Sequence, residues 1–213
     1  ESGGMTADYN ALQREISSMR TVFRRKRRVR VKTQTGTDVE FLTGGRWVLE
    51  DNGICNRPQQ VSNLPAGKVF VLPKEGTMSG RIVIDGSWQG DLLSDPVSFQ
   101  VENGIVVDVS GGTLADDIKS LYEQAKEGIR STKRDLAWTV AEFGFGMNPK
   151  ATYLIGNKVE DLVVRGSAYF GFGDNTHIGG KARVGIHQRG VMRSPEVSLE
   201  EITLLSEGKL SFR

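Results

Sequence analysis

Short runs in which apolar and polar residues alternate recur along most of the chain, and they constrain its fold more than any other feature. Val29 and Val31, for example, alternate with charged residues. This period of two is typical of a strand with one buried and one solvated face. The pair Asn103-Gly104 separates two such runs and is typical of a β-hairpin turn. Further strands are predicted at residues 38–42, 46–49, 68–72, 80–85, 97–101, 105–109, 136–143, 162–172, 195–199 and 201–204.

Two segments have a helical period instead. The first is predicted over residues 7–25, where Asp8 lies near the positive end of the helix dipole. The second is predicted to run to about residue 131, with Thr113 as its cap and Asp116 three positions later. The expected buried stripes are Leu12, Ile16, Met19 and Phe23 in the first helix, and Leu114, Ile118, Leu121 and Ala125 in the second. We therefore expect one α+β domain with a mostly antiparallel, curled or barrel-like sheet and two main helices.

Composition limits the class of protein further. The chain has 213 residues, 38% of them hydrophobic, and a formal net charge of +2, which is typical of a folded globular domain and not of a disordered chain. We find no apolar stretch of membrane-spanning length and no signal segment, and the single cysteine, Cys55, suits a reducing compartment, so we expect a cytoplasmic protein. Residues 1–4 read as an expression scar and residues 5–213 as the domain.

The densest charge feature is the basic stretch at residues 24–32, which includes Arg24, Arg25, Arg27 and Arg28. Such a run can neutralise phosphates, so a basic nucleic-acid-binding protein is one hypothesis. We favour a solvated face or an acidic partner, because the rest of the chain balances the charge and no aromatic residues are interleaved to stack bases.

Two histidines, His177 and His187, lie in a glycine-rich region downstream of Asp174, and imidazoles with a carboxylate are common metal ligands. Ten residues separate the histidines, and this spacing matches no metal motif, so hydrogen-bonded surface histidines are the simpler interpretation. The glycines form no phosphate-binding fingerprint, and we interpret them as close-packing or turn residues: Gly144, Gly146, Gly171 and Gly173.

Several short motifs occur in a characteristic order between about residues 7 and 209. They are Gly36-Thr37-Asp38, Asn63-Leu64-Pro65-Ala66-Gly67, Ile84-Asp85-Gly86, Ala141-Glu142-Phe143-Gly144, Gly171-Phe172-Gly173-Asp174-Asn175, Gly179-Gly180 and Ile186-His187. Together they resemble the aminopeptidase T family of metallopeptidases and its relatives among the dihydroxypyridine ring-cleaving dioxygenases. The resemblance covers the carboxy-terminal half of that family, and we expect the family's amino-terminal α/β domain to be absent.

The resemblance also implies where metal ligands would fall. The family's ligand positions match Lys68, Glu142, Tyr169, His187 and Arg189. A glutamate, a histidine and an aspartate of the family pattern are thereby replaced by lysine, tyrosine and arginine, which leaves one carboxylate and adds two cations. We therefore expect no metal, no cofactor and no catalytic residues. His177 is a possible replacement ligand beside Glu142 and His187.

The leading hypothesis is a non-catalytic peptide-binding protein derived from a metallo-aminopeptidase fold, with a precursor or leader peptide of ribosomal-peptide natural-product biosynthesis as one possible ligand. We expect an acidic peptide or protein partner, a homodimer, and neither membrane nor nucleic acid as a partner. Partner binding is assigned to Arg24, Arg25, Arg27, Arg28, Lys68 and Arg189. The alternative is a metal-dependent aminopeptidase or a non-haem-iron ring-cleaving dioxygenase that uses Glu142, His177 and His187.

Overall fold

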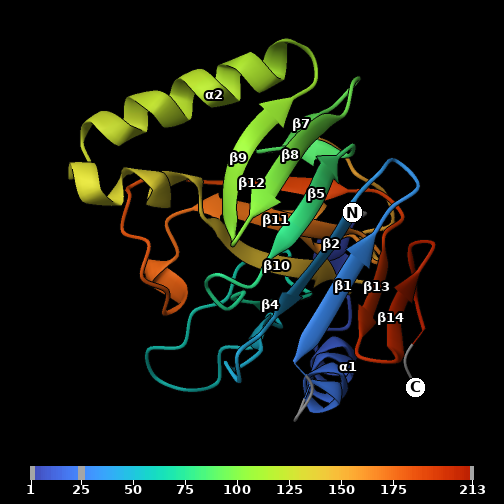
Figure 1. The fold of residues 1–213 in the computed structure, drawn as a ribbon. Helices are drawn as coiled ribbons and strands as arrows, with labels where there is room; N and C mark the ends of the chain where they lie inside the picture. The colour runs from blue at the N-terminus through green and yellow to red at the C-terminus, as the bar shows by residue number, and fades with distance from the viewer. Residues whose placement is uncertain (1–2, 24–26, 212–213) are drawn as a thin grey trace.

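The fold is built from two antiparallel sheets that pack face to face (Figure 1). A computed structural model describes residues 3–23 and 27–211. The first sheet has the order β15 (Lys209–Leu210), β14 (Ile202–Ser206), β13 (Glu196–Leu199), β1 (Arg28–Lys32), β2 (Asp38–Leu42), β5 (Ser79–Ile84), β8 (Val97–Glu102) and β9 (Ile105–Ser110). The second has the order β3 (Leu49–Asp51), β4 (Lys68–Val71), β10 (Val140–Gly146), β11 (Ala168–Gly173), β12 (His187–Met192), β6 (Ser87–Trp88) and β7 (Asp91–Leu92).

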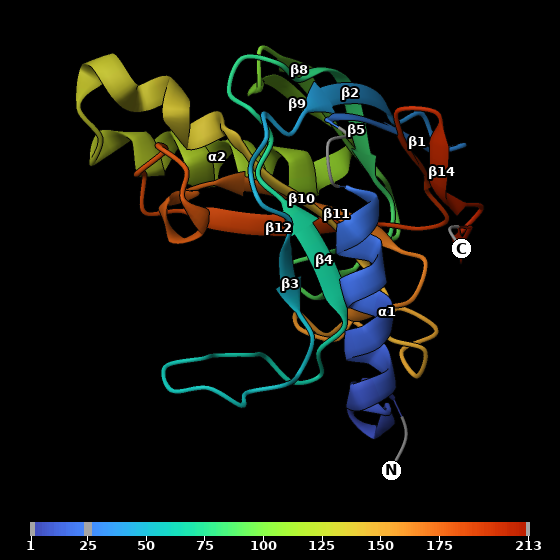
Figure 2. The ribbon, with the colours of Figure 1, turned by 90° about the horizontal axis from the view of Figure 1, so that it is seen from below.

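Two α-helices flank these sheets, as expected. Helix α1 (Tyr9–Val22) lies along β4 in Figure 2 and buries its predicted stripe, while the Asp8 carboxylate accepts hydrogen bonds from the backbone N–H groups of Asn10 and Ala11, both at 3.0 Å. Helix α2 (Gly112–Glu127) packs near β9. Four short 3₁₀ segments complete the helical content of the described residues: η1 (Gly4–Thr6), η2 (Ser131–Trp138), η3 (Asp161–Val163) and η4 (Thr176–Ile178). The α+β prediction is confirmed, and the described strands form two open sheets and not a closed barrel.

The start of helix α2 differs from the prediction. Gly111, with φ 119°, precedes the first helical residue and no side chain caps the helix, so the predicted Thr113 cap is wrong. The buried stripe also differs, because Tyr122 stacks on Trp138 and donates a hydrogen bond to the carbonyl of Phe172 at 3.0 Å. This turns the face of Ala115, Ile118 and Tyr122 inward and leaves Leu121 40% exposed.

Several strand limits also differ. The segment predicted as a strand at 46–49 begins in a turn after two glycines with positive φ, and β3 starts only at Leu49. The first residues of the strand predicted at 136–143 belong to η2 instead. The first residues of the strand predicted at 162–172 belong to η3 and to a turn at Gly166, where φ is 85°. The hairpin at Asn103-Gly104 is confirmed, since both residues have positive φ. Among the described helices, none combines the length and apolar character needed to cross a lipid bilayer.

One hydrophobic core joins the two sheets. Phe99 of β8 stacks on Phe172 of β11 with ring centroids 4.5 Å apart, and Phe41 of β2 meets Phe143 of β10 edge to face at 5.5 Å. The alternate residues of β10 and β11 therefore point away from the first sheet. That outer face of the second sheet carries the residues that the sequence analysis singled out.

Candidate functional site

Glycines line the outer face of the second sheet and leave room for functional side chains. In β10 and β11, phenylalanines that face the core alternate with Gly144, Gly146, Gly171 and Gly173. A Cβ atom on Gly144 would lie 2.5 Å from Cζ of Tyr169, and one on Gly171 would lie 2.6 Å from Cγ of Glu142. The interpretation of these four glycines as close-packing or turn residues is confirmed.

All five positions matched to family metal ligands gather on this face. Lys68 comes from β4, Glu142 from β10, Tyr169 from β11, and both His187 and Arg189 from β12, which are four neighbouring strands of one sheet. Lys68, Glu142, Tyr169 and Arg189 line a cavity of about 190 Å³, and His187 contacts Glu142. The structure thus brings together positions that are far apart in sequence.

Glu142 is the centre of the cluster. Its carboxylate is 1% exposed and its Oε1 atom accepts a hydrogen bond from Nε of Arg189, while Nε2 of His187 lies 3.6 Å from the same oxygen. Burial opposes ionisation of this carboxyl, but the neighbouring His187 and Arg189 outweigh burial and lower the pKa of Glu142 to about 2. Glu142 is therefore a carboxylate at neutral pH, held by a guanidinium.

A second buried ion pair, which the sequence analysis did not find, lies beside the first. Nζ of Lys68 is 3.6 Å from Oδ2 of Asp51, and both side chains are at least nine-tenths buried. Burial lowers the pKa of Lys68, and Asp51 opposes that shift. Asp51 also accepts hydrogen bonds from the hydroxyl of Ser62, from the backbone N–H of Asn63 at 3.0 Å and from its amide at 2.8 Å. No motif marked Asp51, because its partners lie 11 to 17 positions along the chain.

His177 reaches the same cluster from η4. Its ring lies edge to face with the His187 ring at a centroid distance of 5.0 Å. Burial lowers the pKa of His177, and the neighbouring His187 lowers it further. One ligand atom from each of Glu142, His177 and His187 lies within 4.8 Å of the others. The expectation that these histidines are ordinary surface groups does not describe His187, which is partly buried in the cluster.

Two features of this trio favour a cation. Nδ1 of His187 is 2.7 Å from the carbonyl oxygen of Asp174, so the ring donates a proton there and its Nε2 atom is the one that faces Glu142. Within the described part of the chain, that Nε2 atom and Oε2 of Glu142 are buried without a hydrogen-bond partner. A third feature opposes a cation, because Arg189 already bonds to Glu142 and Lys68 lies nearby.

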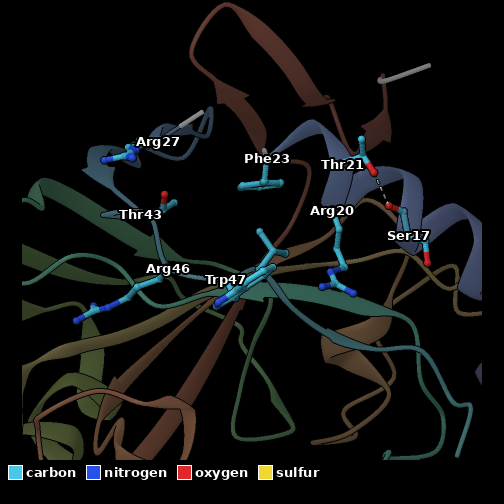
Figure 3. Close-up of a pocket in the computed structure, with 10 residues that line it drawn as sticks. Ser17, Arg20, Thr21, Phe23, Arg27, Thr43, Arg46 and Trp47 are labelled. Carbon is cyan, nitrogen blue, oxygen red and sulfur yellow. Dashed lines mark hydrogen bonds between the residues drawn. The ribbon is translucent and has the colours of Figure 1, made fainter. Parts of the chain in front are cut away.

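The described part of the basic stretch, Arg27 and strand β1, lies elsewhere. Arg28 pairs with Glu40 at 2.8 Å, and Arg30 makes two hydrogen bonds of 3.1 Å to Asp38, so these exposed cations are balanced by the neighbouring strand β2. Arg27 lines a separate groove (Figure 3). Arg24 and Arg25 lie outside the described residues. Arg27 and Arg28, which the structure describes, do not line the cavity that holds Lys68 and Arg189.

Three comparisons with known proteins agree with this fold. Residues 5–212 match the sequence profile of a family described as 2,5-dihydroxypyridine 5,6-dioxygenase. The chain is 19% identical, over 211 residues, to the 2,5-dihydroxypyridine 5,6-dioxygenase of Pseudomonas putida KT2440, and the match covers 92% of this chain and 57% of that protein. The chain thus spans somewhat more than half the length of this relative.

Solved structures give the same result for the fold. The structure of the Pseudomonas putida dioxygenase superposes with a TM-score of 0.87 at 18% identity, covering 99% of this chain and 62% of that one. Wild-type AmpT from Thermus thermophilus superposes with a TM-score of 0.75 at 14% identity, covering 98% of this chain and 57% of that one. The expected likeness to both groups of enzymes is confirmed at the level of the fold.

Proposed function

The chain belongs to the 2,5-dihydroxypyridine 5,6-dioxygenase family, and from that premise we propose that it is a non-catalytic binding protein in which ion pairs replace the metal centre. The observation that carries this proposal is the hydrogen bond from Nε of Arg189 to Glu142. Glu142 is the carboxylate retained among the five positions matched to metal ligands. In the proposed state the Arg189 guanidinium takes the place of a metal ion beside this carboxylate.

Charge balance supports the same conclusion. The carboxylates of Glu142 and Asp51 are matched by the cations of Arg189 and Lys68, so the buried cluster is formally neutral without an ion. A divalent cation added to this neutral cluster would be an uncompensated buried charge, which is strongly unfavourable. Beside Glu142 alone, Lys68 and Arg189 would leave a surplus of positive charge. Asp51 removes much of that surplus by pairing with Lys68.

The proposed ligand is a peptide or protein segment with acidic residues. Arg189 lines the cavity and is 25% exposed, and its terminal nitrogens have no hydrogen-bond partner among the described residues. Because Arg189 is partly exposed, unlike Glu142, its free donors can bind a carboxylate of a bound chain without burying the added charge. A role with a precursor or leader peptide in natural-product biosynthesis, a homodimer and a cytoplasmic location stay predictions.

A second candidate function follows from a specific observation. Oε2 of Glu142 and Nε2 of His187 are buried without partners in the described chain, and His177 lies within reach of both. Two histidines and one carboxylate are the ligand set of many non-haem iron enzymes. In that case Arg189 would orient Glu142 through its hydrogen bond to Oε1, and the chain would be a metal-dependent dioxygenase or aminopeptidase.

Metal content separates the two functions. The protein, purified without chelator, would be incubated with iron, zinc or manganese salts, desalted and analysed for metal, alongside Glu142→Ala and His187→Ala. We expect less than about a tenth of an equivalent per chain, with no difference between the proteins. About one equivalent that both substitutions abolish, together with consumption of 2,5-dihydroxypyridine or of a peptide, would establish the enzyme instead.

A further inference from the structure

A groove of about 500 Å³ lies between the end of helix α1 and the segment that joins β2 to β3 (Figure 3). Its walls combine apolar side chains with arginines, and none of its described lining residues is acidic. The lining residues used below are Arg20, Phe23, Arg27, Arg46, Trp47 and Val48. Residues 24–26, which lie between Phe23 and Arg27, are outside the described structure and are not part of the site.

Trp47 is the most unusual residue of this groove. Its side chain is 79% exposed, whereas the neighbouring Phe23 and Val48 are buried. Tryptophan is the residue most enriched among binding hot spots, because it contributes a large apolar area and loses little conformational freedom on binding. An exposed tryptophan in a groove that is also lined by the buried apolar side chains of Phe23 and Val48 therefore points to contact with another molecule.

The backbone around Trp47 is held in place. Gly44 and Gly45 adopt positive φ values of 64° and 78°, and the N–H of Arg46 donates to the carbonyl of Thr43 at 3.1 Å. The Arg46 guanidinium donates to the carbonyl of Pro73 at 2.8 Å and to both carboxylate oxygens of Glu75. The turn is thus fixed before any ligand binds, which limits the entropy lost on association.

The arginines differ in what they can offer a ligand. Arg46 is neutralised by Glu75, and Arg20 is neutralised by Glu50 at 3.0 Å. Arg27 is exposed and its guanidinium forms no ion pair within residues 3–23 and 27–211, while its backbone N–H donates to the Glu200 carboxylate at 3.1 Å. Because Arg20 and Arg46 are already paired, Arg27 is the described lining residue that can offer a positive charge to an acidic ligand.

We propose that this groove binds an acidic peptide segment of a partner protein, with an apolar side chain packed on Trp47 and a carboxylate paired with Arg27. This inference rests on the proposed binding function and assigns it a surface. Glu50, the partner of Arg20, also lines the central cavity beside Lys68, so the groove and the cavity adjoin across a single ion pair.

Fluorescence polarisation with a labelled synthetic peptide tests the site. The probe is an acetylated and amidated peptide of glutamates around a central phenylalanine, and matched probes carry glutamine for glutamate or alanine for phenylalanine. We expect the acidic probe to bind, both matched probes to bind more weakly, and Trp47→Ala and Arg27→Ala each to lower the affinity about tenfold or more. Affinity should also fall as salt is raised.

Two variants outside the groove serve as controls. Tyr153→Ala removes another exposed aromatic side chain, and Arg81→Ala removes an exposed arginine of β5. Both should bind the probe like the unmodified protein, and circular dichroism would confirm that every variant is folded. No binding of the acidic probe, equal binding of the glutamine probe, or full affinity in folded Trp47→Ala and Arg27→Ala would overturn the inference. Metal content, measured on the same preparations, reports separately on the proposed function.

Discussion

Arg189 and Glu142 are joined across Gly171, which is the paired residue of both: Glu142 lies opposite Gly171 between β10 and β11, and Arg189 lies opposite it between β11 and β12. Side chains in such a row of three strands point to the same face. Because the middle residue has no side chain, the guanidinium reaches the carboxylate directly above the backbone of β11. The ion pair thus depends on a glycine as much as on its two charges.

Substitution of Gly171 by alanine should disrupt this pair. The new Cβ atom would lie 2.6 Å from Cγ of Glu142 and 3.0 Å from Cε1 of His187, so one of these buried side chains must move. Overpacking of this kind costs roughly 1–3 kcal/mol, measured as the free energy of unfolding in urea. Gly128→Ala is the matched control, because its new Cβ would meet its nearest atom at 4.0 Å and its φ is −80°. Equal stabilities of the two variants would contradict this account.

The charge of Glu142 should make stability depend on pH. Its pKa falls from the ordinary 4.5 to about 2 on folding, so between these values the unfolded chain binds more protons than the folded one. The carboxylate therefore stabilises the fold above its unfolded pKa, and this contribution is lost as the pH falls toward the folded pKa. The difference in unfolding free energy between the unmodified protein and Glu142→Gln should shrink as the pH is lowered from about 5 toward 2. A difference that stays constant over this range would refute the assignment.

Asp51 should control both stability and the order of the loop that follows β3. Asp51→Ala would leave the Lys68 ammonium buried without its partner and would release Ser62 and Asn63. Loss of one member of a buried pair costs about 3 kcal/mol or more, so urea unfolding should shift strongly. Trypsin should also cleave faster at Arg57 within the released loop. Asp38→Ala, which breaks an exposed pair with Arg30, is the control and should change stability by less than about 1 kcal/mol.

A metal site should return when the replaced ligands are restored. The triple variant Lys68→Glu, Tyr169→His and Arg189→Asp places two carboxylates and an imidazole beside Glu142 and His187 and removes two cations. We expect a folded triple variant to bind about one equivalent of a divalent metal per chain, and to lose it when Glu142→Ala is added. Tyr169→His alone, which keeps both cations, is the control and should bind far less. Metal content in the triple variant no higher than in the unmodified protein would argue against the matched positions.

Much of the fold could be predicted because its strands bury one face each. The alternation at residues 38–42 located β2 with its correct limits, and Asn103-Gly104 located the β8–β9 hairpin. Strand β12 was not predicted, because its first three residues, His187, Gln188 and Arg189, are polar and only partly buried. Its position in the sheet is fixed by pairing with β11, which is a tertiary interaction that no local pattern encodes.

The candidate site was predicted unevenly for a related reason. Glu142 and His187 were recognisable from motifs. The ion pair between Lys68 and Asp51 links two strands across the loop at residues 52–67, and the motif within that loop does not indicate how the strands pair. Trp47 was missed because an exposed tryptophan and a buried one look alike in sequence. It lies in a segment that was predicted as a strand, and only the turn formed by Gly44 and Gly45 shows that its side chain faces solvent.

Because phenylalanine and glycine alternate in β10 and β11, one face of these strands must satisfy the packing of the core and the other face carries the residues that determine the chemistry. Substitutions at Phe143 or Phe172 change the volume of the shared core and therefore affect the stability of the fold. Substitutions on the opposite face, at Glu142 or Tyr169, alter charge and ligand chemistry while the aromatic layer stays intact. A scaffold arranged in this way can exchange a reaction for a recognition task within a few mutational steps, because the residues that define its chemistry are not the residues that fill its core.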